Sequence, residues 1–283
     1  SYMDTINSED FTVRRADIDW DKYANTNWFK MGGVDAIFDD IQYNVDELGT
    51  SFEDLTDYLH MEYDLDTDDA MKAIRAYQDA LTDENIQKKY ERQQQAQELV
   101  LKNAMSAYKT AGMSANEYME TATSFSASLI NSLGGDTVKA AKQTDVAMRA
   151  MSDNVNTFGT DMQSVQYAFQ GFAKQNYTML DNLKLGYGGT KEEMERLIAD
   201  ANEYSATMSS MSFDDFSEAM KNTGMSADEM REKYDMLTNS TNLSMDSFSD
   251  VVTAIELIQQ KQGIAGTTAR EAATTIEGSV NMA

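Results

Sequence analysis

Apolar side chains recur every three or four residues along most of the chain, the period of an α-helix that buries one face. The first run begins at Val34 and ends at Gly49, with apolar positions at Ile37, Ile41, Val45 and Leu48. No stretch shows the strict two-residue alternation that is typical of a strand. The pattern predicts an all-α protein: one or more multi-helix bundles with short glycine-containing turns and one long connecting helix.

Expected helix starts carry a serine or threonine with an acidic residue three positions later, the pattern in which the hydroxyl accepts a backbone N–H. Ser51 with Asp54 predicts one such start. Complete capping boxes are predicted for Ser114 with Glu117, Ser226 with Glu229, Thr190 with Glu193, and Thr268 with Glu271. The first two follow Gly112-Met113 and Gly224-Met225. We interpret this similarity as two helix junctions that use the same glycine stop and capping box, rather than as a true internal repeat.

The longest predicted helix runs from Thr82 to Gly112 and has a very polar middle. About 28 residues at ~1.5 Å each give a length of about 42 Å. Such a helix is either a solvated connector between two bodies or one arm of a helical hairpin. The expected organisation is an acidic, partly helical segment over 1–66, a hairpin or connector over 67–112, and a helical domain over 113–283.

After residue 113, helices are expected to alternate with turns at Gly134-Gly135, Gly159, Gly186 to Gly189, Gly224, and Gly263 to Gly266. Three helical faces are predicted between these turns. The first carries Val165, Phe169 and Phe172, and the second Met194, Leu197, Ile198, Ala201 and Met208. The third carries Phe248, Val251, Val252, Ile255 and Ile258.

Charge narrows the possible partners. The chain has 283 residues with 48 acidic and 23 basic side chains, a net charge of -25. Phosphates would be repelled, so we expect neither tight nucleic-acid binding nor attraction to anionic membranes. The excess of acidic over basic side chains is unevenly distributed along the chain. Residues 71–112 carry a net charge of +2, while the segments on either side are strongly acidic.

Other features of the composition exclude further classes of site and of protein. The absence of cysteine excludes disulfides, thiolate catalysis and cysteine metal sites. No apolar run is long enough to span a bilayer and no secretory signal is visible, so we expect no stable membrane insertion. Because the sequence does not begin with Met, we expect it to be a piece of something longer.

Candidate chemical sites are weak. Asp64, Asp66, Asp68 and Asp69 resemble a calcium loop, but Asp69 and Arg75 stand where an EF-hand needs Gly and Glu, so a carboxylate-rich helix start is favoured. His60 is the only histidine, which argues against a catalytic triad or a histidine metal cluster. Paired acids such as Asp39-Asp40 are adjacent, so on a helix they diverge by about 100°. We therefore expect no enzyme, no metal site and no cofactor.

The turn over residues 185–191 contains three glycines and a lysine, but its spacing and the lack of a preceding strand do not fit a phosphate-binding loop. We expect a flexible turn with glycines at positive φ. The apolar residues around it either fold back onto their own helices or dock a partner. The candidate interaction loop consists of Phe169, Phe172, Tyr177, Met179, Leu180, Leu183, Leu185, Gly186, Tyr187, Gly188 and Gly189.

Methionine is frequent, with 20 residues in the chain and eight of them between Met194 and Met245. Methionine fills irregular gaps in cores and also suits adaptable interfaces. Core filling is favoured, although the serine-rich setting over residues 205–245 is also typical of a contact surface.

Two long blocks resemble one protein family. They are residues 164–191 (SVQYAFQGFAKQNYTMLDNLKLGYGGTK) and 254–280 (AIELIQQKQGIAGTTAREAATTIEGSV). Residues 103–161 are similar to the same family in general character. The blocks resemble tail tape-measure proteins of long-tailed phages and prophages of Gram-positive bacteria. The resemblance covers about residues 100–283, with residues 205–245 as an apparent insertion. Residues 1–99 match nothing, and the long monotonous helix of the ruler is absent.

The resemblance implies a structural segment that acts in tail assembly and length determination and in DNA ejection. Its implied partners are tail-tube, tail-tip or assembly-chaperone proteins and other tape-measure copies. Its implied location is the virion tail, assembled in the bacterial host cytoplasm. Two alternatives stay open: a secreted helical effector or interaction module of prophage origin whose active part is residues 1–99, and a wall hydrolase, for which no motif is visible.

Overall fold

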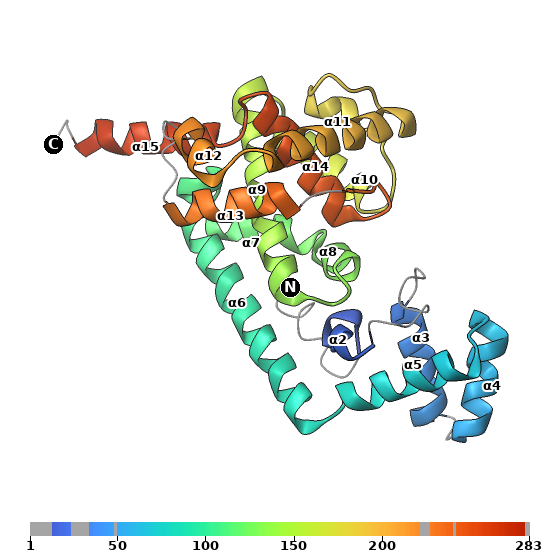
Figure 1. Cartoon of the computed structure of the whole chain (residues 1–283). Coiled ribbons are helices and arrows are strands. Elements are labelled where there is room, and N and C mark those ends of the chain that lie inside the picture. Colours follow the sequence, from blue (N-terminus) through green and yellow to red (C-terminus); the bar gives the residue numbers. More distant parts are fainter. Residues whose placement is uncertain (1–12, 24–33, 48–49, 221–226, 240–241, 281–283) are drawn as a thin grey trace. The chain divides into compact units, whose positions relative to one another are not determined.

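The computed structural model describes residues 13–23, 34–47, 50–220, 227–239 and 242–280, and helices dominate this part of the chain (Figure 1). No strand occurs among these residues, so the predicted all-α class is confirmed. The elements are η1 (Arg15–Asp17), α2 (Trp20–Tyr23), α3 (Val34–Gln42), η3 (Tyr43–Glu47), α4 (Phe52–Tyr63), α5 (Thr67–Ala80), α6 (Asp83–Ala111), α7 (Ala115–Thr123), α8 (Ser126–Ser132), α9 (Thr137–Phe158), α10 (Met162–Phe172), η4 (Leu180–Leu183), α11 (Lys191–Ser209), α12 (Phe213–Met220), α13 (Ala227–Asn239), α14 (Phe248–Lys261) and α15 (Thr267–Val280).

The chain divides into two compact units. Among the described residues, the N-terminal unit comprises those between 13 and 98 together with 133–139, and the C-terminal unit comprises those between 99 and 132 and between 140 and 280. This division differs from the expected boundaries at residues 66 and 112. The physical reason is that α6 is one unbroken helix whose two halves pack in different units, so its ends do not mark the boundary.

The core of the N-terminal unit is formed by α3, α4 and α5. Of the predicted stripe, Ile37 and Ile41 are buried in α3, together with Val34. Val45 is 43% exposed, contrary to the prediction, because the continuation expected to Leu48 becomes the π-helical η3. Leu48 and Gly49 themselves lie outside the described residues. Leu55 and Leu59 of α4 and Ala70, Ala73, Ile74 and Tyr77 of α5 complete this core.

Local caps start the helices of this core as the sequence predicts. The Ser51 hydroxyl accepts the backbone N–H of Asp54 at the start of α4. The Asp66 carboxylate accepts that of Asp69 at the start of α5, which confirms the helix-start interpretation of the acidic run. Asp64 ends α4 in the left-handed region with φ 54°. His60 is exposed, with Nδ1 lying 2.6 Å from the carbonyl oxygen of Leu65.

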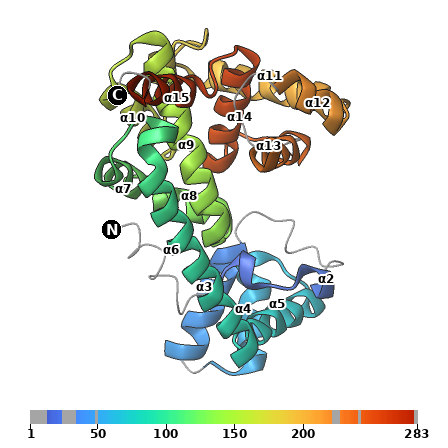
Figure 2. The same ribbon diagram turned by 90° about the vertical axis from the view of Figure 1, so that its left-hand side faces the viewer.

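α14 is the central helix of the C-terminal unit. Every residue from Phe248 to Gln259 is buried except Asp250, which is half-buried, so the helix is covered on nearly all sides. It packs against α11 and α8, and α11 lies beside it in both views (Figure 1, Figure 2). The predicted faces of α10, α11 and α14 are buried, except that Met208 is only half-buried.

The expected insertion near residues 205–245 contains α12 and α13, which pack on each other, and α13 also packs on α11. The Ser205 hydroxyl donates to the carbonyl of Leu237, and the Tyr234 hydroxyl donates to that of Met211 at 2.6 Å. Phe216 and Leu237 are fully buried. Met208 and Met211 are half-buried at this junction, an arrangement that combines gap filling with partial exposure.

Capping in the C-terminal unit is partly non-local. Gly112 ends α6 with φ 62°, and Ser114 with Glu117 forms the predicted box. Ser226 lies outside the described residues. Thr190 accepts the N–H of Glu193, but the Glu193 carboxylate turns to Gly188 instead of closing a box. The box predicted at Thr268 is wrong, because α15 already begins at Thr267 and Thr268 lies inside its first turn. The amides of Gly266 and Thr268 donate to Asp153 of α9 instead.

Candidate interaction site

The candidate interaction loop connects α10 to α11 and is ordered by its own backbone. Gln175 and Lys184 take positive φ values of 56° and 51°. The amide of Asn176 donates to the carbonyl of Gly171, and the Asn176 side chain accepts the amide of Thr178, which closes a turn. A 3₁₀ turn, η4, follows before the glycines. The loop is therefore a defined structure rather than a flexible link.

The loop folds back onto its own helices, which is the first of the two alternatives that the sequence left open. Of the eight non-glycine candidates, seven are at most 9% exposed, and Met179 is the exception at 42%. The seven are Phe169, Phe172, Tyr177, Leu180, Leu183, Leu185 and Tyr187. Their apolar surface fills the core of the C-terminal unit, so a partner cannot reach it in this conformation.

Long-range hydrogen bonds hold the loop in place. The Tyr177 hydroxyl donates to the carbonyl of Met245 at 2.6 Å, just before α14. The Asn154 amide of α9 donates to the carbonyl of Leu183 at 2.6 Å. The Gln262 amide, after α14, donates to the carbonyl of Leu185 at 2.9 Å. The loop carbonyls of Leu183 and Leu185 thus each have a partner from a different part of the unit.

A network of four side chains clamps the glycine turn. The Tyr187 hydroxyl donates to Asp200 at 2.7 Å, and the Arg196 guanidinium lies over the Tyr187 ring, 4.2 Å from its centroid. Burial and the hydrogen bond to Asp200 raise the pKa of Tyr187. Arg196 also donates to the carbonyl of Gly186 and pairs with Glu193. The turn is consequently closed by protein groups.

The same turn does not bind phosphate in the way a glycine-rich loop does. The amide of Gly188 donates to the Glu193 carboxylate at 2.9 Å, so an acidic group occupies the position where a phosphate would bind. The expected positive φ holds for Gly186 at 89°, but not for Gly188 or Gly189. Gly189 is required for a different reason, because a Cβ there would lie 2.3 Å from the carbonyl oxygen of Thr178.

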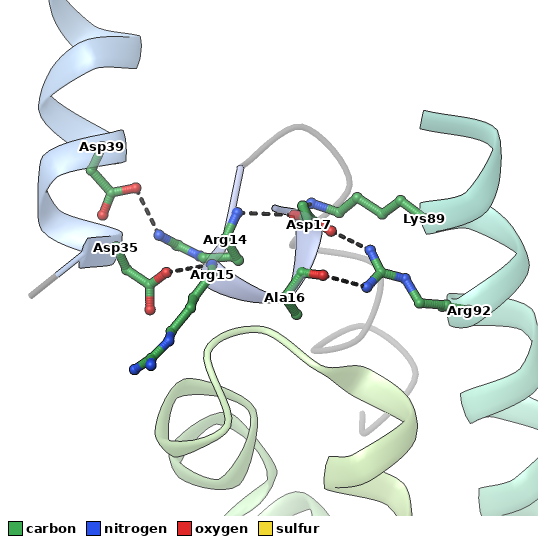
Figure 3. Close-up of polar contacts among 8 residues, drawn as sticks. All are labelled: Arg14, Arg15, Ala16, Asp17, Asp35, Asp39, Lys89 and Arg92. Carbon is green, nitrogen blue, oxygen red and sulfur yellow. Dashed lines mark hydrogen bonds and ion pairs between the residues drawn. The ribbon is translucent and has the colours of Figure 1, made fainter. Parts of the chain in front are cut away.

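A polar cluster in the N-terminal unit was not predicted from the sequence (Figure 3). The Asp17 carboxylate is paired with both Lys89 and Arg92 of α6, and it also accepts the backbone amide of Arg14 at 2.9 Å. Arg92 donates a second hydrogen bond to the carbonyl of Ala16. A segment near the start of the chain is thereby attached to α6.

Two further contacts extend this cluster to α3. Arg14 donates to Asp39 at 2.7 Å, and the backbone amide of Arg15 donates to Asp35 at 2.9 Å (Figure 3). Burial is the main cause that raises the pKa of Asp35. The one signal in the sequence is an adjacent arginine pair inside a strongly acidic segment. Through these contacts the cluster acts as a clasp that holds the segment against both α3 and α6.

Buried carboxylates in the C-terminal unit are likewise structural. Asp145 pairs with Arg149 at 2.7 Å and accepts the Tyr118 hydroxyl at 3.3 Å. Burial raises the pKa of Asp145 and of Asp153, and the nearby Glu256 adds to both shifts.

The described residues contain no group of three potential ligands that could hold a metal ion. They also contain no helix long and apolar enough to cross a bilayer.

Comparison of the chain with protein-family models, with curated proteins and with solved structures gave no match in any of the three.

Proposed function

We propose that the chain is a folded structural segment of a phage tail tape-measure protein that acts in tail assembly and length determination and accompanies DNA ejection. The proposal rests on the resemblance of residues 164–191 and 254–280 to that family. Its partners would be tail-tube, tail-tip or assembly-chaperone proteins and other tape-measure copies. It would reside in the virion tail after assembly in the host cytoplasm.

One structural observation supports this proposal most directly. The two blocks that carry the resemblance lie far apart in the chain but pack into a single core. Gln262 of the second block donates to the carbonyl of Leu185 in the first, and α14 packs against α11, which begins where the first block ends. Blocks that share one core are expected to be retained together as a folding unit, which fits a globular helical portion rather than the ruler helix.

The charge also suits this role. A net charge of -25 disfavours adhesion to duplex DNA, and a protein that shares a tube with passing DNA benefits from not binding it.

The test is to purify long-tailed particles from a culture that carries the natural gene and to analyse the tails by mass spectrometry. Peptides of this chain should sediment with intact tails. An in-frame deletion of the gene should abolish tails or make their length irregular, and a wild-type copy should restore them. Chain found outside cells and free of particles would support the effector instead, and lysis bands in a peptidoglycan gel would support the hydrolase.

A further inference from the structure

The half of α6 that belongs to the C-terminal unit carries two apolar stripes side by side. The first consists of Val100, Ala104, Ala107 and Ala111, which are at most 3% exposed and face the core of the unit. The second consists of Leu101, Met105 and Tyr108, which are 51%, 83% and 65% exposed. Because these three follow at i, i+4 and i+7, they share one face of the helix.

The second stripe adds little to the packing of its own unit, because the alanine-rich stripe supplies the buried contact and all three side chains of the second stripe are more than half exposed. Elsewhere in the described part of this unit, the large apolar side chains that remain exposed are Tyr167 and Met179, which are isolated from each other in sequence. Single exposed apolar residues are ordinary, whereas a contiguous apolar patch marks a binding surface. Met105 and Tyr108 are also residue types that are enriched at protein interfaces.

The charge beside this stripe is opposite to that of the whole chain. Lys102 and Lys109 are exposed at its two ends, and neither forms an ion pair with a described residue. Between Glu98 and Glu117 the sequence contains no acidic residue, although the chain as a whole carries net -25. The surface therefore combines an apolar centre with a basic rim.

We propose that the stripe formed by Leu101, Met105 and Tyr108 docks an acidic amphipathic helix of another protein. Leucine-sized side chains on one face of that helix would pack on the stripe, and its flanking carboxylates would pair with Lys102 and Lys109. This proposal does not depend on the tape-measure proposal, because it rests only on the exposed face of α6.

A second copy of this chain is a poorer occupant. Antiparallel pairing of two α6 stripes would bring Lys102 of each copy towards Lys109 of the other, and parallel pairing would align like residues. Both arrangements oppose equal charges, and two chains of net -25 also repel each other at longer range. An acidic helix from a different protein avoids the first of these conflicts and uses the lysines.

The test measures fluorescence anisotropy of a labelled synthetic peptide of about 20 residues, long enough to form a helix on docking. Its leucines are spaced at i, i+3, i+4 and i+7 and its flanking positions are glutamate; a control peptide has lysine at those positions. The acidic peptide should bind the full chain more tightly than the basic one, and added salt should weaken this binding.

Variants assign the binding to the stripe. Combining Leu101→Ser, Met105→Ser and Tyr108→Ser should weaken binding of the acidic peptide by about tenfold or more, since truncation of a few central contacts removes most interface energy. Combining Lys102→Glu and Lys109→Glu should reverse the preference in favour of the basic peptide. Met61→Ser removes a methionine that is 78% exposed in the N-terminal unit and should leave binding unchanged.

Circular dichroism checks that each variant keeps its helical content, which is expected because all five α6 positions are exposed. The proposal is overturned if the wild-type chain does not bind the acidic peptide or binds both peptides equally, or if the triple variant binds as the wild type does. It is also overturned if sedimentation shows a wild-type dimer that the triple variant loses, because a second copy then covers the stripe.

Discussion

The carboxylate of Asp153 in α9 caps a helix more than a hundred residues away: its Oδ1 atom accepts the backbone amide of Thr268 at 2.8 Å. Its Oδ2 atom accepts the amide of Gly266 at 2.6 Å. Two amides at the start of α15, those of Gly266 and Thr268, are therefore satisfied by a side chain of another helix. Asp153, which is 2% exposed, thus fastens the start of α15 to α9, and a hydrogen bond between the Thr157 and Thr267 hydroxyls adds to this contact.

Asp153→Ala should lower the free energy of unfolding by about 1–2 kcal/mol, because it removes a helix cap and leaves amides without an acceptor. Hydrogen exchange should show loss of protection at the start of α15. Glu271→Ala is the matched control, since the capping box predicted from the sequence would make Glu271 the important residue. Equal loss of protection in both variants would contradict the cap observed here.

The buried acids Asp145 and Asp153 should give stability a distinctive dependence on pH. Burial raises the pKa of each above the value of 3.8 for an exposed aspartate, so the native state binds these protons more readily than the unfolded chain. Their contribution to stability therefore grows as the pH falls from neutrality through the raised pKa values towards about 4, and it is constant below that.

Combining Asp145→Asn with Asp153→Asn removes both titrations. The stability of the wild-type chain relative to this variant should be greater near pH 4 than at pH 7, as measured by urea unfolding across that range. Exposed acids such as Glu193, whose pKa Arg196 lowers, act in the opposite direction but are present in both proteins and cancel in the comparison. Parallel pH profiles would show that the two aspartates do not titrate differently on folding.

Phe169→Ala should cost about 3–5 kcal/mol, because Phe169 is fully buried and its ring contacts that of Phe172 at a centroid distance of 5.8 Å. Met179→Ala in the same loop should change stability by less than about 0.5 kcal/mol, because Met179 is 42% exposed. Denaturant unfolding of both variants distinguishes a folded-back loop from a docking loop. A docking loop would tolerate both substitutions.

The sequence predicted what depends on near neighbours. The stripe of Val34, Ile37 and Ile41 and the caps at Ser51 and Ser114 are local relationships within one or two helical turns, and the structure confirms them. The apolar character of residues 169–187 was also visible, but periodicity does not say what covers an apolar face. Burial by the same unit and docking to a partner give identical patterns until the fold is known.

The rest depends on pairs that are distant in the chain. No local rule identifies Asp153 as the cap of α15. The local capping box predicted at Thr268 was wrong, because the Thr268 amide donates to the distant Asp153 carboxylate. The same holds for Asp17 with Arg92, since 75 residues separate two ordinary surface-type side chains. The domain boundary inside α6 was equally invisible, because a continuous helix carries no break in its pattern.

Glycines in the turn before α11 should tolerate substitution unequally. Gly189→Ala should destabilise the chain by about 3 kcal/mol, because the new Cβ would lie 2.3 Å from the carbonyl oxygen of Thr178 and would force the backbone apart. Gly186→Ala should cost less, about 1–2 kcal/mol, because its φ of 89° is strained for alanine but no atom lies within 4 Å of the added carbon. Thermal unfolding compares the two, and the reverse order would contradict the close approach at Gly189.

Asp17→Ala should release the segment near the start of the chain from α6. Asp17 is the common partner of Lys89 and Arg92, and its side chain is only 9% exposed, so its loss leaves two neighbouring cations without their shared acceptor. Breaking a largely buried pair in this way should cost about 2–3 kcal/mol. Glu84 pairs with Lys88 on the exposed surface of the same helix, at 2.7 Å, and Glu84→Ala should change little because solvent screens that pair. Hydrogen exchange of the amides around residues 14–18 is the measurement, since loss of the clasp should raise their exchange in Asp17→Ala and leave it unchanged in Glu84→Ala. Unchanged protection in both would mean that the contacts of Arg14 and Arg15 with α3 hold the segment by themselves.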